Sequence, residues 1–165
     1  MRTVVIVLLG VLVVAAGVLV PTMWFDLRHL READAAGAQA MAAARKVAPD
    51  LLSYDYRTVE ADLAKARTYT TGALTGQYRE LATTLVPRAR AQKVVQTVAV
   101  AGVGVEHAEP DRVEVLLFVN TGTVKEIPGE AEPQQQFTQN RARFVMVRQD
   151  SRWLVADLST LLGTA

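Results

Sequence analysis

Residues 113–124 read VEVLLFVNTGTV, and this stretch predicts a β-strand near the middle of a sheet. Side chains alternate between the two faces of a strand, so the apolar residues at positions 113, 115, 117 and 119 share one face. Leu116 and Phe118 fall on the opposite face. We therefore expect both faces of the sheet to be partly covered near the middle of this strand.

Three further strands are predicted, one before this strand in the sequence and two after it. Residues 94–105 are rich in valine and threonine, and Gly102 and Gly104 within them predict a bulge or a bend. Residues 137–149 and 153–158 follow, and the polar residues between them predict a hairpin turn. The sheet is therefore expected to consist of consecutive antiparallel strands.

Helical patterns precede the strands. Thr58 is expected to cap a helix whose first turn carries Glu60 and Asp62, because acidic side chains stabilise the N-terminal end of a helix. A second amphipathic helix is predicted from Leu74, with its apolar residues at helical spacing, and is expected to stop near Pro87.

Helices followed by consecutive strands indicate an α+β domain, with the helices packed on one face of a curved antiparallel sheet. The glycine-marked bends would help that sheet to curl into a cone. The segment 127–136 contains two prolines and is expected to form a long exposed loop between two of the strands.

The N-terminal end carries an unbroken apolar run from Val4 to Val20. As a helix this run spans about 25 Å, and Trp24 and Phe25 beyond it suit a membrane–water boundary. Cleaved signal peptides usually have apolar regions of about 7–15 residues, and a core helix in a short chain would show a polar stripe. We therefore expect residues 1–25 to be a retained membrane anchor.

Residues 26–48 are expected to form a helical stalk outside the membrane. Arg2 precedes the apolar run and mixed charges follow it, which predicts a single-pass protein with a cytoplasmic N-terminus and an extracytoplasmic C-terminal domain. The stalk is rich in alanine, which favours a helix and permits close approach of a sheet, another helix or a partner protein. A break at Pro49 opens the predicted domain, residues 49–165.

The composition of the chain argues against several classes of site. The 18 basic and 17 acidic residues give a net charge of +1, which argues against a nucleic-acid binder with a basic face. Cysteine is absent, so disulfides, thiol catalysis and cysteine metal sites are excluded. His29 and His107 lie far apart in the sequence, without further ligands at metal-binding spacing. We expect no catalytic, cofactor-binding or metal-binding residues.

The cluster Tyr54-Asp55-Tyr56 is the strongest candidate for chemistry. It could supply an acid and hydrogen-bond donors, as a proton-shuttling site needs. Adjacent side chains point in different directions, however, and a catalytic site requires groups that converge. We therefore favour packing for Tyr54 and Tyr56 and a turn-capping role for Asp55.

Several short motifs accompany the predicted anchor and stalk. They are LLSYDYRT at residues 51–58, a Thr-Gly pair followed by Gln77-Tyr78, Val86-Pro87, Lys93, and VEVLLFVN at residues 113–120. In this order they resemble the actinobacterial Mce-associated membrane proteins, and the resemblance covers nearly the whole chain.

This resemblance implies a nuclear-transport-factor-2-like cone and a non-enzymatic accessory subunit of an Mce-type lipid or sterol import complex. Its partners would be the bilayer, Mce transporter proteins or permease subunits, and lipid. Two alternatives remain: a cone that binds or transforms an apolar small molecule, and a subunit of an assembly like a type IV secretion channel. The residues expected to line the core or a pocket are Tyr54, Tyr56, Phe118, Phe144, Met146 and Trp153.

Overall fold

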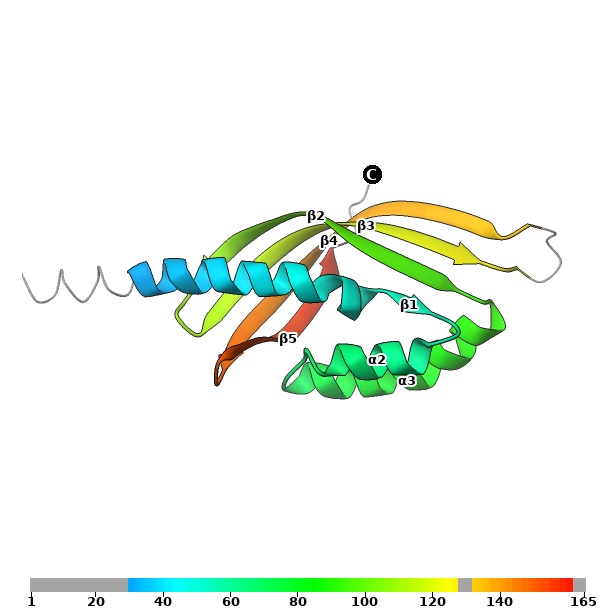
Figure 1. Ribbon diagram of the computed structural model, residues 1–165, viewed down its shortest axis with the longest axis horizontal. Helices are drawn as coiled ribbons and strands as arrows, with labels where there is room; N and C mark the ends of the chain where they lie inside the picture. Colours follow the sequence, from blue (N-terminus) through cyan, green and yellow to red (C-terminus); the bar gives the residue numbers. More distant parts are fainter. Residues whose placement is uncertain (1–29, 128–131, 162–165) are drawn as a thin grey trace, which may run out of the picture.

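The computed structural model describes residues 30–127 and 132–161, which form an arched antiparallel sheet with helices on its concave side (Figure 1). This arrangement confirms the expected α+β class. The sheet has five strands in the order β1-β2-β3-β4-β5, so each strand pairs with its neighbours in the sequence. The strands are β1 Tyr54–Asp55, β2 Val95–Ala108, β3 Arg112–Lys125, β4 Gln134–Gln149 and β5 Arg152–Leu161. The helices comprise residues 30–52, α2 Val59–Arg67 and α3 Ala73–Ala91.

The concave face of the sheet carries the hydrophobic core. Val113, Val115 and Leu117 of β3 are fully buried there, as the alternation of residues 113–119 predicts. Phe144 and Met146 of β4 are also fully buried, opposite Val115 and Val113 in the register. The core is therefore a layer between one face of the sheet and the helices.

Strand β2 contains two bulges, of which one lies at a glycine where a bulge or bend was expected and the other does not. The β2–β3 register shifts between Val100 and Gly102, which confirms an irregularity at Gly102. The second shift lies between Val105 and His107 rather than at Gly104. Each bulge adds a residue to one strand and increases its local twist, so two bulges in β2 help the sheet to arch.

Two prolines do not end helices as expected. Pro87 lies inside α3, which continues to Ala91, and Ala89 beyond the proline is fully buried. The first helix likewise continues past Pro49 through residue 52. A proline inside a helix loses one hydrogen bond, and in α3 the packing of the segment after the proline offsets that loss.

The helix over residues 30–52 is an integral part of the domain. Ala40, Ala44 and Ala48 are fully buried in the core, so the stalk expected over residues 26–48 packs against the domain within its described part. A side chain at Gly37 would place its Cβ 3.5 Å from the Cβ of Ala108, so this helix contacts β2 almost backbone to backbone. The boundary predicted between residues 48 and 49 falls inside the helix, and the small alanines explain why it packs so closely.

The predicted strand ends also need correction. β4 begins at Gln134, which pairs with Lys125, so the expected loop over 127–136 is shorter than predicted at its C-terminal end. The two-residue β1 was not predicted, and Tyr54 in it pairs with Gln96 of β2. The turn between β4 and β5 is confirmed: Gln149 pairs with Arg152, and Asp150 adopts a positive φ of 54°.

The expected membrane anchor, with Val4, Val20, Trp24 and Phe25, lies outside the described residues. Within the described part of the chain, the helices are too short or too polar to span a bilayer.

Candidate functional site

Three features of the surface could serve a function. A polar recess lies beside β1, where the first helix, α2 and β2 meet. An apolar cavity lies between the helices and the concave face of the sheet. The convex face of the sheet, here called the outer face, carries exposed aromatic side chains.

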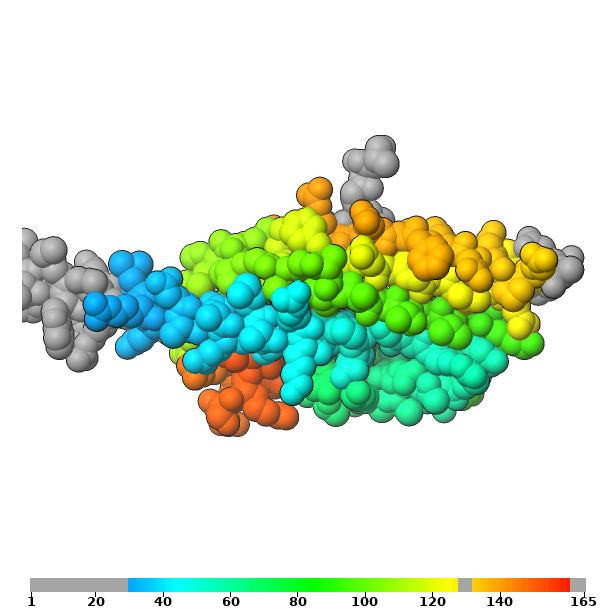
Figure 2. Space-filling model, turned by 45° about the horizontal axis from the view of Figure 1, so that its top comes forward, coloured from blue at the N-terminus to red at the C-terminus, as the bar shows by residue number. Residues whose placement is uncertain are grey.

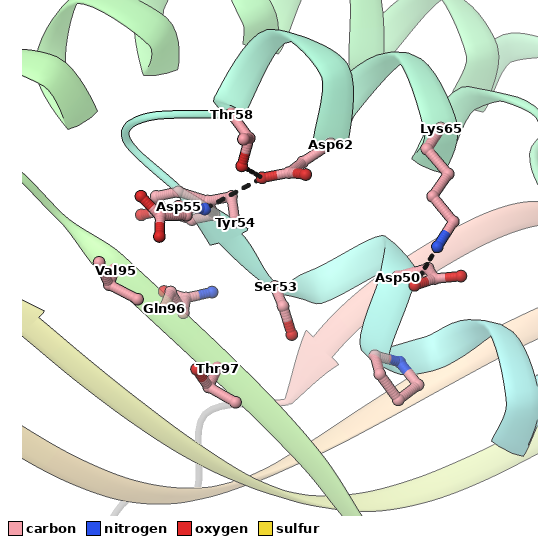
Figure 3. Close-up of a pocket in the computed structure, with 11 residues that line it drawn as sticks. Asp50, Ser53, Tyr54, Asp55, Thr58, Asp62, Lys65, Val95, Gln96 and Thr97 are labelled. Carbon is pink, nitrogen blue, oxygen red and sulfur yellow. Dashed lines mark hydrogen bonds and ion pairs between the residues drawn. The ribbon is translucent and has the colours of Figure 1, made fainter.

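The polar recess has a volume of about 310 Å³ and contains the predicted acid Asp55 (Figure 3). Asp62 of α2 accepts hydrogen bonds from the backbone N–H of Asp55, at 3.0 Å, and from the hydroxyl of Thr58, at 2.9 Å. Lys65 donates to Asp50 at 2.9 Å. Thr58 stands at the N-cap of α2 as expected, but its hydroxyl binds Asp62 and makes no capping bond to the backbone.

Asp55 itself forms a turn. Its carboxylate accepts from the backbone N–H of Arg57 at 2.9 Å and from the Arg57 guanidinium. These hydrogen bonds, aided by the charge of Arg57, hold the pKa of Asp55 below its ordinary value. A carboxylate stabilised in its ionised form is poorly suited to act as an acid at neutral pH, so Asp55 caps a turn, as favoured from the sequence.

The two flanking tyrosines are packing residues. Tyr54 and Tyr56 are partly buried against the core. Burial raises the pKa of the Tyr54 hydroxyl, and the charge of Arg88 acts in the opposite direction. The carboxylates of the recess thus bind cations or donors from this same chain, and the recess connects the first helix to α2.

The apolar cavity has a volume of about 370 Å³. Leu51 and Leu63 are buried in its walls, whereas Leu81 at its opening is 42% exposed. Two side chains bind carbonyls at the end of the first helix: the Tyr78 hydroxyl donates to the carbonyl of Leu51 at 2.9 Å, and Gln96 Nε2 donates to that of Leu52 at 2.7 Å. These bonds satisfy polar groups beside an otherwise apolar space.

Tyr78 provides a test of this arrangement. Burial raises the pKa of Tyr78 to about 12 from an ordinary value of 10.0, so the folded chain retains the phenolic proton more tightly than the unfolded chain. The resulting stability is present below pH 10 and is lost as the pH rises towards about 12, by about 2 to 3 kcal/mol for a shift of this size. We expect Tyr78→Phe to lower the free energy of unfolding at pH 7 by about 1 kcal/mol and to flatten its decline between pH 10 and 12, measured by urea unfolding. An unchanged decline would contradict burial of the hydroxyl.

The outer face carries Phe118 and Phe137, which are 45% and 81% exposed. Phe118 was expected to line the core or a pocket; it lies instead on the uncovered face, opposite Arg141, whose guanidinium carbon is 5.9 Å from the ring centroid. Phe137 pairs with Gly122, and a Cβ added there would lie 3.2 Å from the Phe137 ring. A shallow hollow of about 640 Å³ adjoins Phe137, and Figure 2 shows β2, β3 and β4 side by side on the upper surface.

The remaining predicted residues have separate places. Phe144 and Met146 are in the core, and Trp153 is partly buried against it, with Arg148 5.8 Å from its ring centroid. Five of the six residues predicted to line the core or a pocket therefore belong to the core or pack against it, and Phe118 is the exception. Of the six, only Tyr54 lines the apolar cavity. Arg143 lies on the outer face, since it neighbours the buried Phe144 on the same strand, and it binds Glu106 through its guanidinium.

His107 is exposed and lies 3.6 Å from Glu109, while His29 is outside the described residues. Over residues 30–127 and 132–161, no group of three histidine or carboxylate side chains is placed to hold a metal ion.

Sequence reasoning missed the cavity and the exposed Phe137. The cavity leucines come from segments far apart in the chain, so no local pattern joins them; helical spacing did mark Leu74, Tyr78, Leu81 and Leu85 as one face of α3. Phe137 had a local signal, because it is seven residues from Phe144 on the same strand, and an odd separation places side chains on opposite faces.

Comparison with known sequences finds relatives in mycobacteria. The chain is 33% identical over 135 residues to Outer membrane protein Rv1973 of Mycobacterium tuberculosis, covering 80% of each protein. It is 29% identical over 139 residues to the uncharacterized protein Rv1362c of the same species, and it spans 61% of the length of that relative. No protein-family model matches the chain.

Comparison with solved structures shows the fold. The IcmL-like type IV secretion system protein of Legionella pneumophila superimposes with a TM-score of 0.59 at 10% identity, over 78% of this chain and 94% of that one. The VirB8 protein of Agrobacterium tumefaciens gives a TM-score of 0.55 at 11% identity, over 78% and 93%. An Ntf2-like protein involved in plasmid conjugation is also similar, with a TM-score of 0.53. The domain therefore has the nuclear-transport-factor-2-like fold.

Proposed function

Because this chain belongs to the family of the mycobacterial Outer membrane protein Rv1973, we propose that it is a non-enzymatic assembly subunit of a cell-envelope complex. The fold supports this proposal, since secretion-system proteins such as the IcmL-like protein and VirB8 share it. In the recess, each of the carboxylates of Asp50, Asp55 and Asp62 accepts a hydrogen bond or pairs with a cation from this chain. That arrangement suits a structural role better than proton transfer.

The observation that carries the proposal is the exposure of two aromatic rings on the outer face. Phe118 and Phe137 are 45% and 81% exposed on a face that the helices in the described part of the chain do not cover. Aromatic rings that become buried on binding contribute strongly to protein interfaces. The outer face is therefore the proposed docking surface of the subunit, with Arg141 beside Phe118 as a polar neighbour.

The proposal includes a membrane location. The apolar run from Val4 to Val20 would anchor the chain, with the N-terminus in the cytoplasm and the folded domain outside. The full-length protein is then expected in membrane fractions at its uncleaved mass. A mature N-terminus near Gly17, determined by intact-mass analysis, would contradict the anchor.

Two kinds of complex fit this role. The shared fold favours an assembly like that of a type IV secretion system. In that case we expect anchored copies of this chain to associate. The narrower alternative, from the sequence resemblance, is an Mce-type lipid import complex with transporter proteins or permease subunits as partners. Affinity purification of the full-length protein in mild detergent, followed by mass spectrometry, distinguishes them. Self-association without transporter components favours the first kind, recovery of Mce proteins favours the second, and persistent isolation as a lone monomer would contradict both.

The docking surface makes its own prediction. Changing both Phe118 and Phe137 to alanine should reduce recovery of the bound partner at least tenfold, because two ring contacts of about 1 kcal/mol or more each are lost. The measurement is quantitative mass spectrometry of the same purification. Leu30→Ala is the matched control, since it truncates an exposed apolar residue of the first helix, away from the outer face. Equal recovery from the double variant and the wild type would show that the partner binds elsewhere.

A further inference from the structure

The apolar cavity has the shape of a ligand site. Its volume of about 370 Å³ lies within the range of about 300–1,000 Å³ typical of small-molecule pockets. Its walls come from the first helix, α2 and α3 and from the strands β1, β2 and β5, so six separate elements line one space. The leucines that line it are Leu51, Leu52, Leu63, Leu74, Leu81, Leu85 and Leu158.

Two polar groups beside the cavity are already hydrogen-bonded. The hydroxyl of Tyr78 and the amide of Gln96 bind the carbonyls of Leu51 and Leu52. Both bonds hold the end of the first helix, which forms one wall, in a fixed position. An apolar occupant would therefore displace water from leucine side chains and would leave these hydrogen bonds intact.

The rim of the cavity limits the charge of the occupant. Asp62 is the one carboxylate among the described lining residues, and its Oδ2 atom already accepts two hydrogen bonds. Lysine and arginine are absent from that lining. A carboxylate or phosphate at the opening would meet the like charge of Asp62. The cations that act on lining residues, Lys65 on Asp62 and Arg88 on Tyr54, do not themselves line the cavity, and Lys65 already binds Asp50. Gln77, in contrast, is an exposed amide at the rim that can bind a hydroxyl or an ester.

We propose that this cavity binds a single acyl chain whose head group is uncharged, such as that of a fatty alcohol or a neutral lipid. The chain lies among the leucines, and the hydroxyl or ester lies at the rim near Gln77 and Asp62. This activity goes beyond the assembly role, because it uses the concave side of the sheet and leaves the outer face free for a partner. Leu81, which is 42% exposed, stands where the chain enters.

Photolabelling of the full-length protein in nanodiscs tests the proposal. The probe is a long-chain alcohol with a diazirine in its chain, supplied either in the nanodisc bilayer or from a cyclodextrin carrier. These two routes distinguish a lipid drawn from the membrane from a free molecule. Labelling is mapped by peptide mass spectrometry. Peptides that contain residues 74–85 of α3 and Leu51 of the first helix should be labelled, and the corresponding fatty acid should label them at least fivefold less.

Two variants separate specific binding from surface adsorption. Leu81→Trp places a larger side chain at the opening and should reduce labelling of α3 at least fivefold. Thr83→Trp adds the same ring to an exposed position of α3 that does not line the cavity, and should label like the wild type. Thermal melts of both variants check the fold. The proposal would be overturned if the alcohol labelled residues 74–85 of Leu81→Trp as strongly as those of the wild type. It would also be overturned if the alcohol and the fatty acid labelled the wild type equally. Loss of partner binding in the variant with both Phe118 and Phe137 changed to alanine would not bear on this proposal, because that variant alters only the outer face.

Discussion

Replacing Ala44 by glutamate should lower the free energy of unfolding by about 3–5 kcal/mol, because the change buries a carboxylate without a partner. Ala44 is fully buried where the first helix packs on the rest of the domain. Glutamate and alanine are both good helix formers, so the loss would not arise from helix propensity. The effect would approach the whole stability of an ordinary domain, and we expect much of the variant to unfold.

Ala42 offers the matched control. It lies in the same helix, two residues away, but its side chain is exposed. Ala42→Glu should change the free energy of unfolding by less than about 0.5 kcal/mol. Urea unfolding of the full-length protein in mild detergent, followed by near-ultraviolet circular dichroism, measures both. If the two variants were equally stable, the helix over residues 30–52 would be a free stalk and not part of the core.

The second large effect is expected at Phe144. Truncation to alanine should cost about 3–5 kcal/mol, because it removes a fully buried ring and leaves a cavity that its neighbours fill only in part. Phe137→Ala on the same strand should change stability by no more than about 0.5 kcal/mol, since its ring is 81% exposed. Chemical unfolding of the two variants side by side provides the measurement.

This pair also separates stability from binding. Phe144→Ala should destabilise the domain, whereas Phe137→Ala should leave it folded and, together with the change at Phe118, impair partner recovery. A large loss of stability in Phe137→Ala would mean that its ring is covered in the folded protein. The outer face would then no longer qualify as an open docking surface.

Much of the sheet could be predicted from local patterns. Alternation of apolar side chains over residues 113–119 marks the buried face of β3, and the structure buries those valines and Leu117. Gly102 marked a bulge that the register confirms. The ends of the helices were harder to predict, because Pro87 and Pro49 lie inside helices that continue beyond them. A proline is a local signal for the end of a helix, but its effect competes with packing contacts between residues that are distant in the sequence.

The candidate sites were harder to predict from the sequence than the sheet. Tyr54, Asp55 and Tyr56 drew attention because they are adjacent, yet the structure assigns them to packing and to a turn. Phe118 was placed on the second face of β3, but whether a layer covers that face depends on the rest of the chain. The cavity needs six elements to meet, and its leucines look like ordinary core residues in each segment.

The sequence by itself determined the α+β class, the order of helices and strands, and which side chains share a face of β3. These properties follow from the fixed periods of helices and strands, which act over a few residues. The tertiary structure decided which face the helices cover, how closely residues 30–52 approach β2, and where a space remains between them. Such contacts join residues distant in the chain, and their free energy depends on the fit of whole surfaces and not on any local pattern.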